Sequence, residues 1–334
     1  MELVNDTDLA AGMFRSGLTD QERMLAVVVA KATYRLGPQG PVRDLEQPYP
    51  VQPEPIETDA GQIPGDLVPW KKAADLFLLG NAEPPPGERT VQMRVSAQVG
   101  EHVSHVVVFG PRVWLRDGTS CTPPQPIRTV PLRWEEAFGG MARLANGREV
   151  PYAYNPLGKG FVLEPSNAEG VPLPALEDER HLLRSVGDQP LPICPAPLPT
   201  GSALLAEDVL AWDKQATVLR TEEVRFKGLS FNQAHPAFRP PSIQPGAPVR
   251  ILGMTGREPL DFAIPERDGV TVDVWLANRK YEFPARIDTV AVLSELRRLV
   301  VVQRCHFTYS LKPGEVRFAR LRYSDPLAPR ATPS

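Results

Sequence analysis

The chain has 334 residues, of which 42% are hydrophobic and 23% charged, so its composition is that of a globular protein rather than a disordered one. A chain of this length buries about three quarters of the surface that it exposes when unfolded, so its core needs no disulfide or metal. The net charge of −3 creates no field that would attract nucleic acid or an anionic membrane, and we expect neither as a partner.

The cysteines and the N-terminal segment both point to the cytoplasm. Three widely spaced cysteines, Cys121, Cys194 and Cys305, are typical of reduced, buried thiols rather than of a secreted disulfide framework. Glu2 and Asp6 lie where a signal peptide would have a basic start followed by an apolar run. No segment reaches the length of a membrane-spanning helix. We therefore expect a cytoplasmic protein.

Proline is the compositional outlier, with 38 residues against a usual share of about 5%. Each proline fixes φ and removes a backbone donor, so prolines cannot lie inside long helices or central strands. The sequence therefore predicts a mainly β protein with long Pro/Gly-rich loops and few short helices.

The first predicted element is a buried strand over Met24–Tyr34, where β-branched residues form a run too short for a typical buried helix. Residues Gly37–Pro69 contain eight prolines and predict an extended arm that follows the surface without regular structure.

Further strands are predicted at Asp75–Gly80, Val91–Val99, Val103–Phe109 and Arg112–Leu115. Apolar and polar residues alternate strictly over Val91–Val99, which is typical of a strand with one buried face. Gly110-Pro111 is a turn signal between the last two strands, so we expect an antiparallel meander.

The middle of the chain, from Pro123 to about Pro199, predicts long ordered loops with brief helical pieces at Trp134–Phe138 and Ala175–Leu183. The segment Ala203–Gln215 predicts the best helix, because its apolar residues can share one face.

The last part of the chain returns to strand signals, followed by a Pro-rich tail over residues 326–334 that we expect to be disordered. These patterns predict antiparallel, β-sandwich-like sheets. Residues 1–325 form either one β-rich domain or two packed lobes, about 1–200 and 201–325; both divisions fit the length. The predicted strands are Val249–Leu252, Leu260–Ile264, Val270–Leu276, Ile287–Leu293, Leu299–Tyr309 and Glu315–Leu321.

No familiar catalytic or metal motif occurs: H-E-x-x-H, C-x-x-C and G-x-S-x-G are all absent. Gly158–Phe161 (GKGF) lacks the upstream glycine of a phosphate loop, and Gly160 stands where a Ser or Thr would bind magnesium. His102 and His105 would point to opposite faces of the predicted strand, which disfavours a shared metal. We expect no cofactor, no metal and no catalytic residue.

Two groups of carboxylates keep an enzymatic alternative open. Glu135 and Glu136, or the cluster Glu177-Asp178-Glu179, could supply the acid pair that sugar chemistry requires on a β scaffold. The simpler interpretations are a short amphipathic turn for the first group and a solvated surface for the second.

Seven segments, in this order along the chain, resemble a family of initially uncharacterised bacterial proteins encoded beside the VgrG and PAAR spike proteins of type VI secretion systems. The pair PLRWEEAFGG and NPLGKGF is the more specific part of the likeness. One passage differs: PAPLPTGSALLAEDVLAWDKQ from Pro195 stands where the family usually carries aromatic and Gly-rich residues, so the cargo of this chain could be unusual. The segments are VVVAKATYRL from Val27, DLVPWKKAADLFLLGNAEPP from Asp66, VVVFGPRVW from Val106, PLRWEEAFGG from Pro131, NPLGKGF from Asn155, LPALED from Leu173 and IDTVAVLSELRRLVVV from Ile287.

The resemblance implies a non-enzymatic adaptor or chaperone that holds an effector toxin in the cytoplasm and couples it to VgrG or PAAR. The runner-up is a β-rich carbohydrate-binding or glycan-hydrolysing protein, and a third possibility is a spike component secreted with the toxin. Binding anchors are expected among aromatics in Pro/Gly-rich loops, although each could equally pin its own loop to a sheet. The candidates are Trp70, Phe138, Tyr152, Tyr154 and Phe161.

Overall fold

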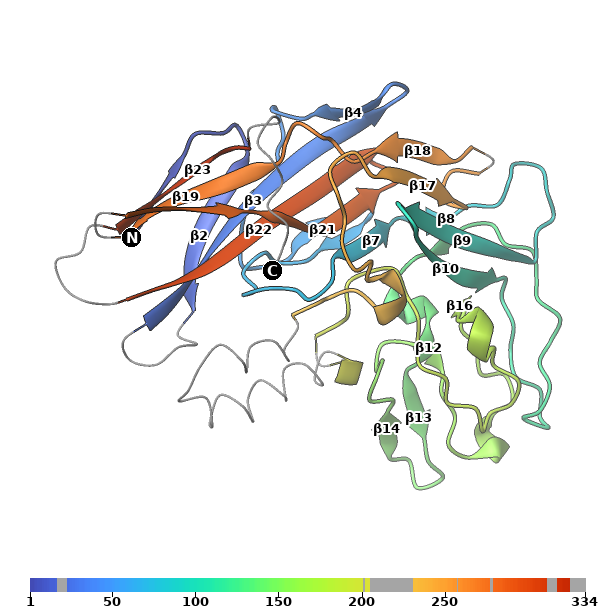
Figure 1. Cartoon of the computed structure of the whole chain (residues 1–334). Coiled ribbons are helices and arrows are strands. Elements are labelled where there is room, and N and C mark those ends of the chain that lie inside the picture. The colour runs from blue at the N-terminus through green and yellow to red at the C-terminus, as the bar shows by residue number, and fades with distance from the viewer. Residues whose placement is uncertain are drawn as a thin grey trace.

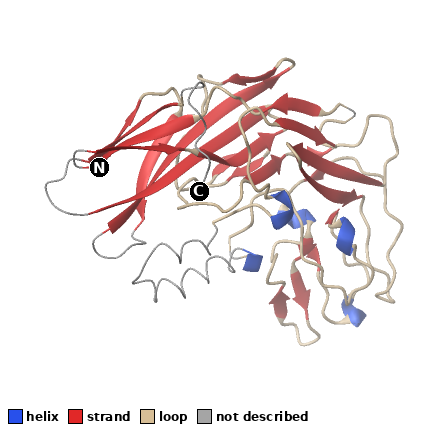
Figure 2. Ribbon diagram, viewed as in Figure 1, coloured by secondary structure: helices blue, strands red, loops and turns tan. Residues whose placement is uncertain are grey.

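The computed structural model describes residues 1–16, 23–200, 202–204, 231–256, 258–276, 279–310 and 317–324. Strands and loops account for nearly all of them, as Figure 2 shows, and the mainly β prediction is confirmed. The helical pieces with described bounds are four three-residue 3₁₀ turns: η1 (Trp134–Glu136), η2 (Pro165–Asn167), η3 (Glu179–His181) and η5 (Pro236–Phe238).

The largest sheet has six strands, in the order β2-β3-β22-β21-β7, with β4 pairing β3. Its two longest strands, β3 and β22, pair antiparallel over the whole of β22 and run diagonally through Figure 1. Leu25–Tyr34 of β3 and Leu299–Cys305 of β22 are buried on both faces, which explains the apolar runs in the sequence. The bounds are β2 (Ala10–Ser16), β3 (Arg23–Gly37), β4 (Gly40–Arg43), β7 (Asp75–Leu79), β21 (Arg286–Leu293) and β22 (Arg298–Ser310).

A second sheet has five strands in the order β16-β10-β9-β17-β18. The predicted pairing of β9 with β10 is confirmed, and the buried residues of β9 alternate as expected. The rest of the predicted meander is wrong: β7 lies in the six-stranded sheet, parallel to β21. The bounds are β9 (Gln92–Val99), β10 (His102–Phe109), β16 (Leu176–Glu177), β17 (Pro248–Leu252) and β18 (Leu260–Ala263).

Arg112–Leu115 also differs from its prediction, because it forms only isolated bridges. The Trp114 N–H donates to the Val171 carbonyl, and the Thr122 N–H donates to the Val113 carbonyl. Two loops thus take the backbone groups that a neighbouring strand would have used.

A third sheet has four strands in the order β1-β23-β19-β20. Its two outer strands were not predicted, and neither was β2. The sequence of β20, RKYEFP, is too charged to give a strand signal, and β1 is too short. The bounds are β1 (Glu2–Asn5), β19 (Val270–Leu276), β20 (Arg279–Pro284) and β23 (Arg317–Tyr323).

Short two-stranded pairs complete the fold. The arm over Gly37–Pro69 is less irregular than expected, because it contributes β4 and the β5–β6 hairpin. The pairs are β5 (Ile56–Thr58) with β6 (Gly61–Ile63), β8 (Asn81–Ala82) with β11 (Val130–Pro131), β12 (Phe138–Gly139) with β15 (Lys159–Gly160), and β13 (Met141–Arg143) with β14 (Glu149–Pro151).

The predicted helical pieces at Trp134–Phe138 and Ala175–Leu183 shrink to η1 and η3. The predicted helix over Ala203–Gln215 lies, beyond Leu204, outside the described residues, and so does the tail over 326–334.

Two hydrophobic clusters form the interior. The main core joins side chains from all three large sheets, for example Phe77, Val106 and Val274. A smaller satellite core, centred on Trp114 and Phe138, lies under the loops of residues 114–186, below the sheets around β12–β14 in Figure 1. Each large sheet combines strands from residues 1–200 with strands from 201–325, so the two segments considered as lobes are interleaved.

Candidate interaction site

Four of the five predicted anchor aromatics come together in the satellite core. The ring centroids of Phe138 and Tyr152 lie 5.0 Å apart, as do those of Tyr152 and Phe161, and Tyr154 lies 5.7 Å from Tyr152. Phe138, Tyr152 and Phe161 are buried, at 3%, 6% and 7% exposure, whereas Tyr154 is half-buried. The three buried rings therefore pack against one another within their own loops, and Tyr154 is the most exposed of the four.

Trp70 belongs to a different place, at the edge of the main core. It is half-buried, with its ring edge-to-face against Phe231 at 5.3 Å and tilted against His306 at 5.9 Å. Trp70 therefore fastens the loop before β7 to β22 and to the segment that begins at Phe231.

The satellite core is built around Asn155, a residue that the sequence did not single out. Its side chain has no exposure, and Nδ2 donates to the carbonyls of Trp134 and Phe138 at 2.8 and 3.0 Å. We call residues 134–140 together with 155–160 the Asn155 knot. It unites the motifs PLRWEEAFGG and NPLGKGF, because β12 pairs parallel with β15.

Glycines in the knot are required by close packing. A Cβ at Gly139 would lie 2.1 Å from the Asn155 carbonyl oxygen, and one at Gly158 would lie 2.4 Å from Asn155 Nδ2. Gly139 also has φ +143, which other residues rarely adopt. The glycines of both motifs thus serve backbone packing.

An ion pair of 2.6 Å between Lys159 Nζ and Glu136 Oε2 crosses the knot. Lys159 is the lysine of the GKGF sequence, so its charge is engaged by a carboxylate of the other motif. Neither residue of the pair is fully exposed, and the pair joins η1 to β15.

A buried charge pair attaches the satellite core to the five-stranded sheet. Arg112 Nη2 donates to Glu177 Oε1 and to the Pro174 carbonyl at 2.9 Å, and its guanidinium lies over the Phe109 ring at 3.9 Å. The second oxygen of Glu177 accepts from the Leu183 N–H at 2.8 Å. Because Glu177 lies in β16, which pairs β10, this contact joins loop and sheet.

The remaining acids of the cluster are also paired. Arg180 hydrogen-bonds Asp178 and holds the pKa of that carboxyl below its ordinary value. Glu179 pairs with Arg94 and with His105 Nε2, the latter at 2.8 Å. A glycosidase acid needs a raised pKa, so the shift at Asp178 has the opposite direction. In the described ranges no group of three or more potential ligands could hold a metal ion.

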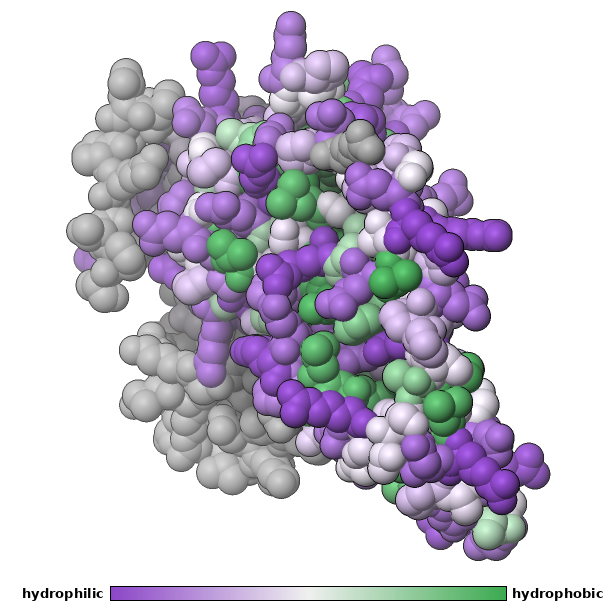
Figure 3. All heavy atoms as spheres, turned by 90° about the vertical axis from the view of Figure 1, so that its right-hand side faces the viewer, coloured by the Kyte–Doolittle hydropathy of each residue, from purple (hydrophilic) through white to green (hydrophobic). Residues whose placement is uncertain are grey.

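Five exposed aliphatic side chains lie in or next to the loops that form the satellite core. Met141 and Leu157, next to the knot glycines, are 49% and 51% exposed. Leu115, Leu163 and Leu191 are exposed in the same loops. Figure 3 shows one face of the molecule, on which apolar side chains form separate patches among charged ones. Met141 and Leu157 offer apolar contacts of the kind that a protein interface needs, next to backbone that the knot holds in place.

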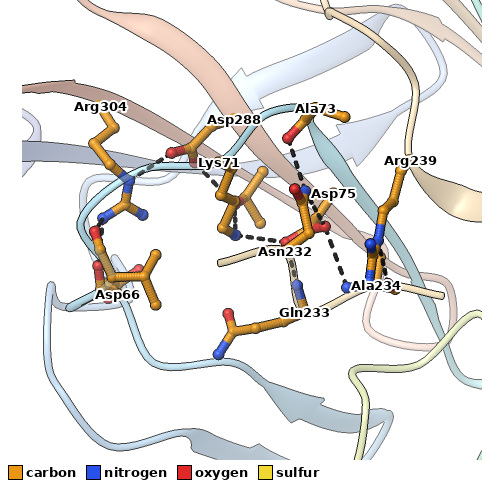
Figure 4. A network of polar contacts seen from close by, with 12 residues as sticks. Asp66, Lys71, Ala73, Asp75, Asn232, Gln233, Ala234, Arg239, Asp288 and Arg304 are labelled. Carbon is orange, nitrogen blue, oxygen red and sulfur yellow. Dashed lines mark hydrogen bonds and ion pairs between the residues drawn. The ribbon is translucent and has the colours of Figure 1, made fainter. Parts of the chain in front are cut away.

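A buried ionic network, shown in Figure 4, fixes the loop before β7. Lys71 Nζ lies 2.7 Å from Asp75 and donates to Thr289 Oγ1 at 2.6 Å. Asp75 also accepts from Asn232 Nδ2 at 2.8 Å and from the Gln233 N–H at 2.9 Å. The loop before β7 and the segment after residue 230 are thereby tied to the same carboxylate.

The network continues along β22. Arg304 donates to Asp288 and to the carbonyl of Asp66, whose carboxylate pairs with Lys31 at 2.5 Å. Asp288 lies in a β-bulge of β21, which redirects its side chain towards Arg304. Burial lowers the pKa of Lys31, although the nearby Asp66 opposes that shift. The charges of opposite sign balance inside the fold, which indicates a structural role.

Among the described residues, no helix has the length and apolar character that crossing a membrane requires.

Comparisons with known proteins show a family but no function. Neither the curated proteins nor the solved structures gave a match. One family model matches residues 21–304, which include the knot, the ionic network and most strands of the three sheets. The chain therefore belongs to the family described as uncharacterized protein conserved in bacteria (DUF2169).

Proposed function

We propose that this chain is a non-enzymatic cytoplasmic adaptor that binds a type VI secretion effector and couples it to the VgrG or PAAR spike. The observation that carries the proposal is the ordered series of seven segments from Val27 to Val302, which resembles the adaptor family over most of the chain. The family description itself names no activity, so the proposal rests on that resemblance.

The geometry supports a binding role in two ways. The more specific motif pair forms the Asn155 knot, a rigid packing device that displays Met141 and Leu157 on its rim. The buried charges, including Arg112 with Glu177 and Lys71 with Asp75, are engaged with one another and stabilise loops. A rigid scaffold with a few exposed apolar anchors is what an adaptor requires.

A glycan-hydrolysing role has less support from the same residues. Glu136 is paired with Lys159 and Glu177 with Arg112, so these carboxylates are held by cations. Glu135 is exposed beside them, and hydrolysis of cell-wall glycans that is abolished by Glu135→Gln would favour this second function.

The test is a pull-down of the tagged protein from its native cells, with mass spectrometry of the bound proteins. We expect a VgrG or PAAR protein together with a toxin. Leu157→Asp should lower the recovery of one of these partners by at least about tenfold, because an exposed apolar anchor is replaced by a charge.

Leu45→Asp is the matched control, since Leu45 is 61% exposed on the arm, away from the knot in sequence. The amount of spike protein and toxin that Leu45→Asp recovers should equal the amount that the wild type recovers. Both variants should keep the wild-type melting temperature. Recovery of no spike protein and no toxin by the wild type would refute the adaptor function.

A further inference from the structure

Among the described residues, strand β20 forms an open sheet edge. It ends the order of the four-stranded sheet, and all of its side chains except Phe283 are exposed. Within the described ranges, no backbone hydrogen bond joins its outer side to another segment. An edge of this kind is a template for an additional strand.

The ladder determines which backbone groups point outward. The Ala285 N–H donates to the Val270 carbonyl at 2.9 Å, and hydrogen-bonded pairs alternate along an antiparallel ladder. Tyr281 and Phe283 therefore bond to β19, whereas Lys280 and Glu282 direct their N–H and C=O groups outward. Pro284 has its missing N–H on the outer side, where no ladder bond is lost.

A second copy of β20 can pair antiparallel with these outward groups. We consider the three registers in which the two-fold axis passes through residue 280, 281 or 282. Two of them place Lys280 opposite Lys280, or Glu282 opposite Glu282, and like charges directly opposite each other are destabilising. The third places Lys280 opposite Glu282 twice, with Tyr281 facing its own copy on the two-fold axis. Both outward residues of each copy then exchange N–H···O bonds, and the tyrosines form a non-hydrogen-bonded pair, where side chains approach most closely.

We propose that β20 pairs with β20 of a second copy of this chain in this third register, so that one continuous sheet runs through a two-fold dimer. The proposal rests on the sequence Lys280-Tyr281-Glu282. When two copies of this segment pair antiparallel, each lysine faces a glutamate of the other copy. A two-fold contact of this kind closes at two subunits.

The side chains at the edge are already held in place. Lys280 Nζ lies 3.0 Å from Asp273 and 2.7 Å from Glu282, and it also lies 5.6 Å from the centre of the Trp275 ring. Arg322 approaches Glu282 at 3.5 Å. Such pre-positioning reduces the entropy lost on pairing. Because one short strand buries little area, we expect a weak dimer, with Kd on the order of 10–100 μM.

The experiment is sedimentation velocity of the full chain over a concentration series, for the wild type, Lys280→Glu and Glu282→Lys. Each variant alone places like charges opposite each other twice and should raise Kd by at least about tenfold. An equimolar mixture of the two variants restores opposite charges at both positions and should recover wild-type dimerisation. A purely structural effect of either substitution would not be rescued by mixing.

Circular dichroism verifies that each variant is folded. If a variant does not fold, Glu282→Pro is used in its place. Proline at this position removes an outward N–H and leaves the hydrogen bonds to β19 intact, so this variant should also be monomeric. A wild type that stays monomeric at several times the expected Kd overturns the proposal, as does a dimer that the single variants leave unchanged or that mixing fails to restore.

Discussion

Replacing Asn155 by alanine should lower the free energy of unfolding by about 2 kcal/mol. The variant loses two buried hydrogen bonds, to the carbonyls of Trp134 and Phe138, which contribute about 1 kcal/mol each. The void left by the carboxamide adds about 1 kcal/mol to the loss. Asn155 Oδ1 is buried without a partner among the described residues. Removing this unsatisfied acceptor relieves its desolvation cost and reduces the loss of stability by about 1 kcal/mol.

Urea unfolding followed by tryptophan fluorescence measures this loss, because Trp134 lies in the knot and reports on it. Asn146→Ala is the matched control: Asn146 is exposed, its side chain accepts from the Arg148 N–H at 2.9 Å, and the change should cost less than about 0.5 kcal/mol. Hydrogen exchange should also become faster over residues 134–161 in Asn155→Ala.

Asn155→Asp sharpens the test, because it keeps the volume and replaces the donor by an oxygen that faces two carbonyls. It should cost more than Asn155→Ala. If both Asn155 variants unfold at the wild-type urea concentration, with unchanged exchange over 134–161, the knot does not depend on this side chain and the reasoning is refuted.

Three further predictions concern charge, pH and thiols. Glu177→Ala leaves the buried Arg112 without its partner and should cost about 3 kcal/mol in urea unfolding, whereas Glu149→Ala at an exposed position should be nearly neutral. Burial lowers the pKa of His235 to about 4, and the charge of Arg239 acts in the same direction. Between about pH 6.5 and pH 4 the unfolded chain therefore binds a proton at this histidine and the folded chain does not. The free energy of unfolding should therefore fall as the pH drops through that window. His235→Asn, whose side chain can still accept from the Ala237 N–H, should make the free energy of unfolding less dependent on pH there. An unchanged pH dependence in this variant would show that His235 is not the titrating group. Burial raises the pKa of the Cys194 thiol, and it raises that of Cys305 to about 12, so a thiol reagent should modify only Cys121 in the native protein and all three cysteines after denaturation.

The sequence predicted the strands that carry a strong local signal. The apolar run of β3 indicates burial on both faces, and the alternation of β9 indicates burial on one face, because successive side chains of a strand point to opposite faces. Prolines correctly indicated loops through the middle of the chain. Strand β20 was not predicted, because an exposed edge strand has no apolar face and therefore no apolar pattern in its sequence.

The candidate site was only partly accessible to sequence reasoning. The motifs PLRWEEAFGG and NPLGKGF were selected, and four loop aromatics within or between them meet in space. Their burial was not predictable, because it depends on the contact between two loops that are separated by about fifteen residues. Asn155 carried a usable signal: an asparagine just before a Gly-x-Gly segment is suited to bond to backbone that glycines allow to approach.

The sequence by itself determined a mainly β chain with Pro-rich loops and the positions of its strongest strands, because propensity and periodicity are local properties. Only the tertiary structure decided that β7 lies beside β21, more than two hundred residues away, and that Asp75 joins Lys71 to Asn232. It also decided that β20 is the last strand of its sheet among the described residues. Partner choice in a sheet and the pairing of buried charges depend on which surfaces fit together after the chain has folded, and no local pattern encodes that fit.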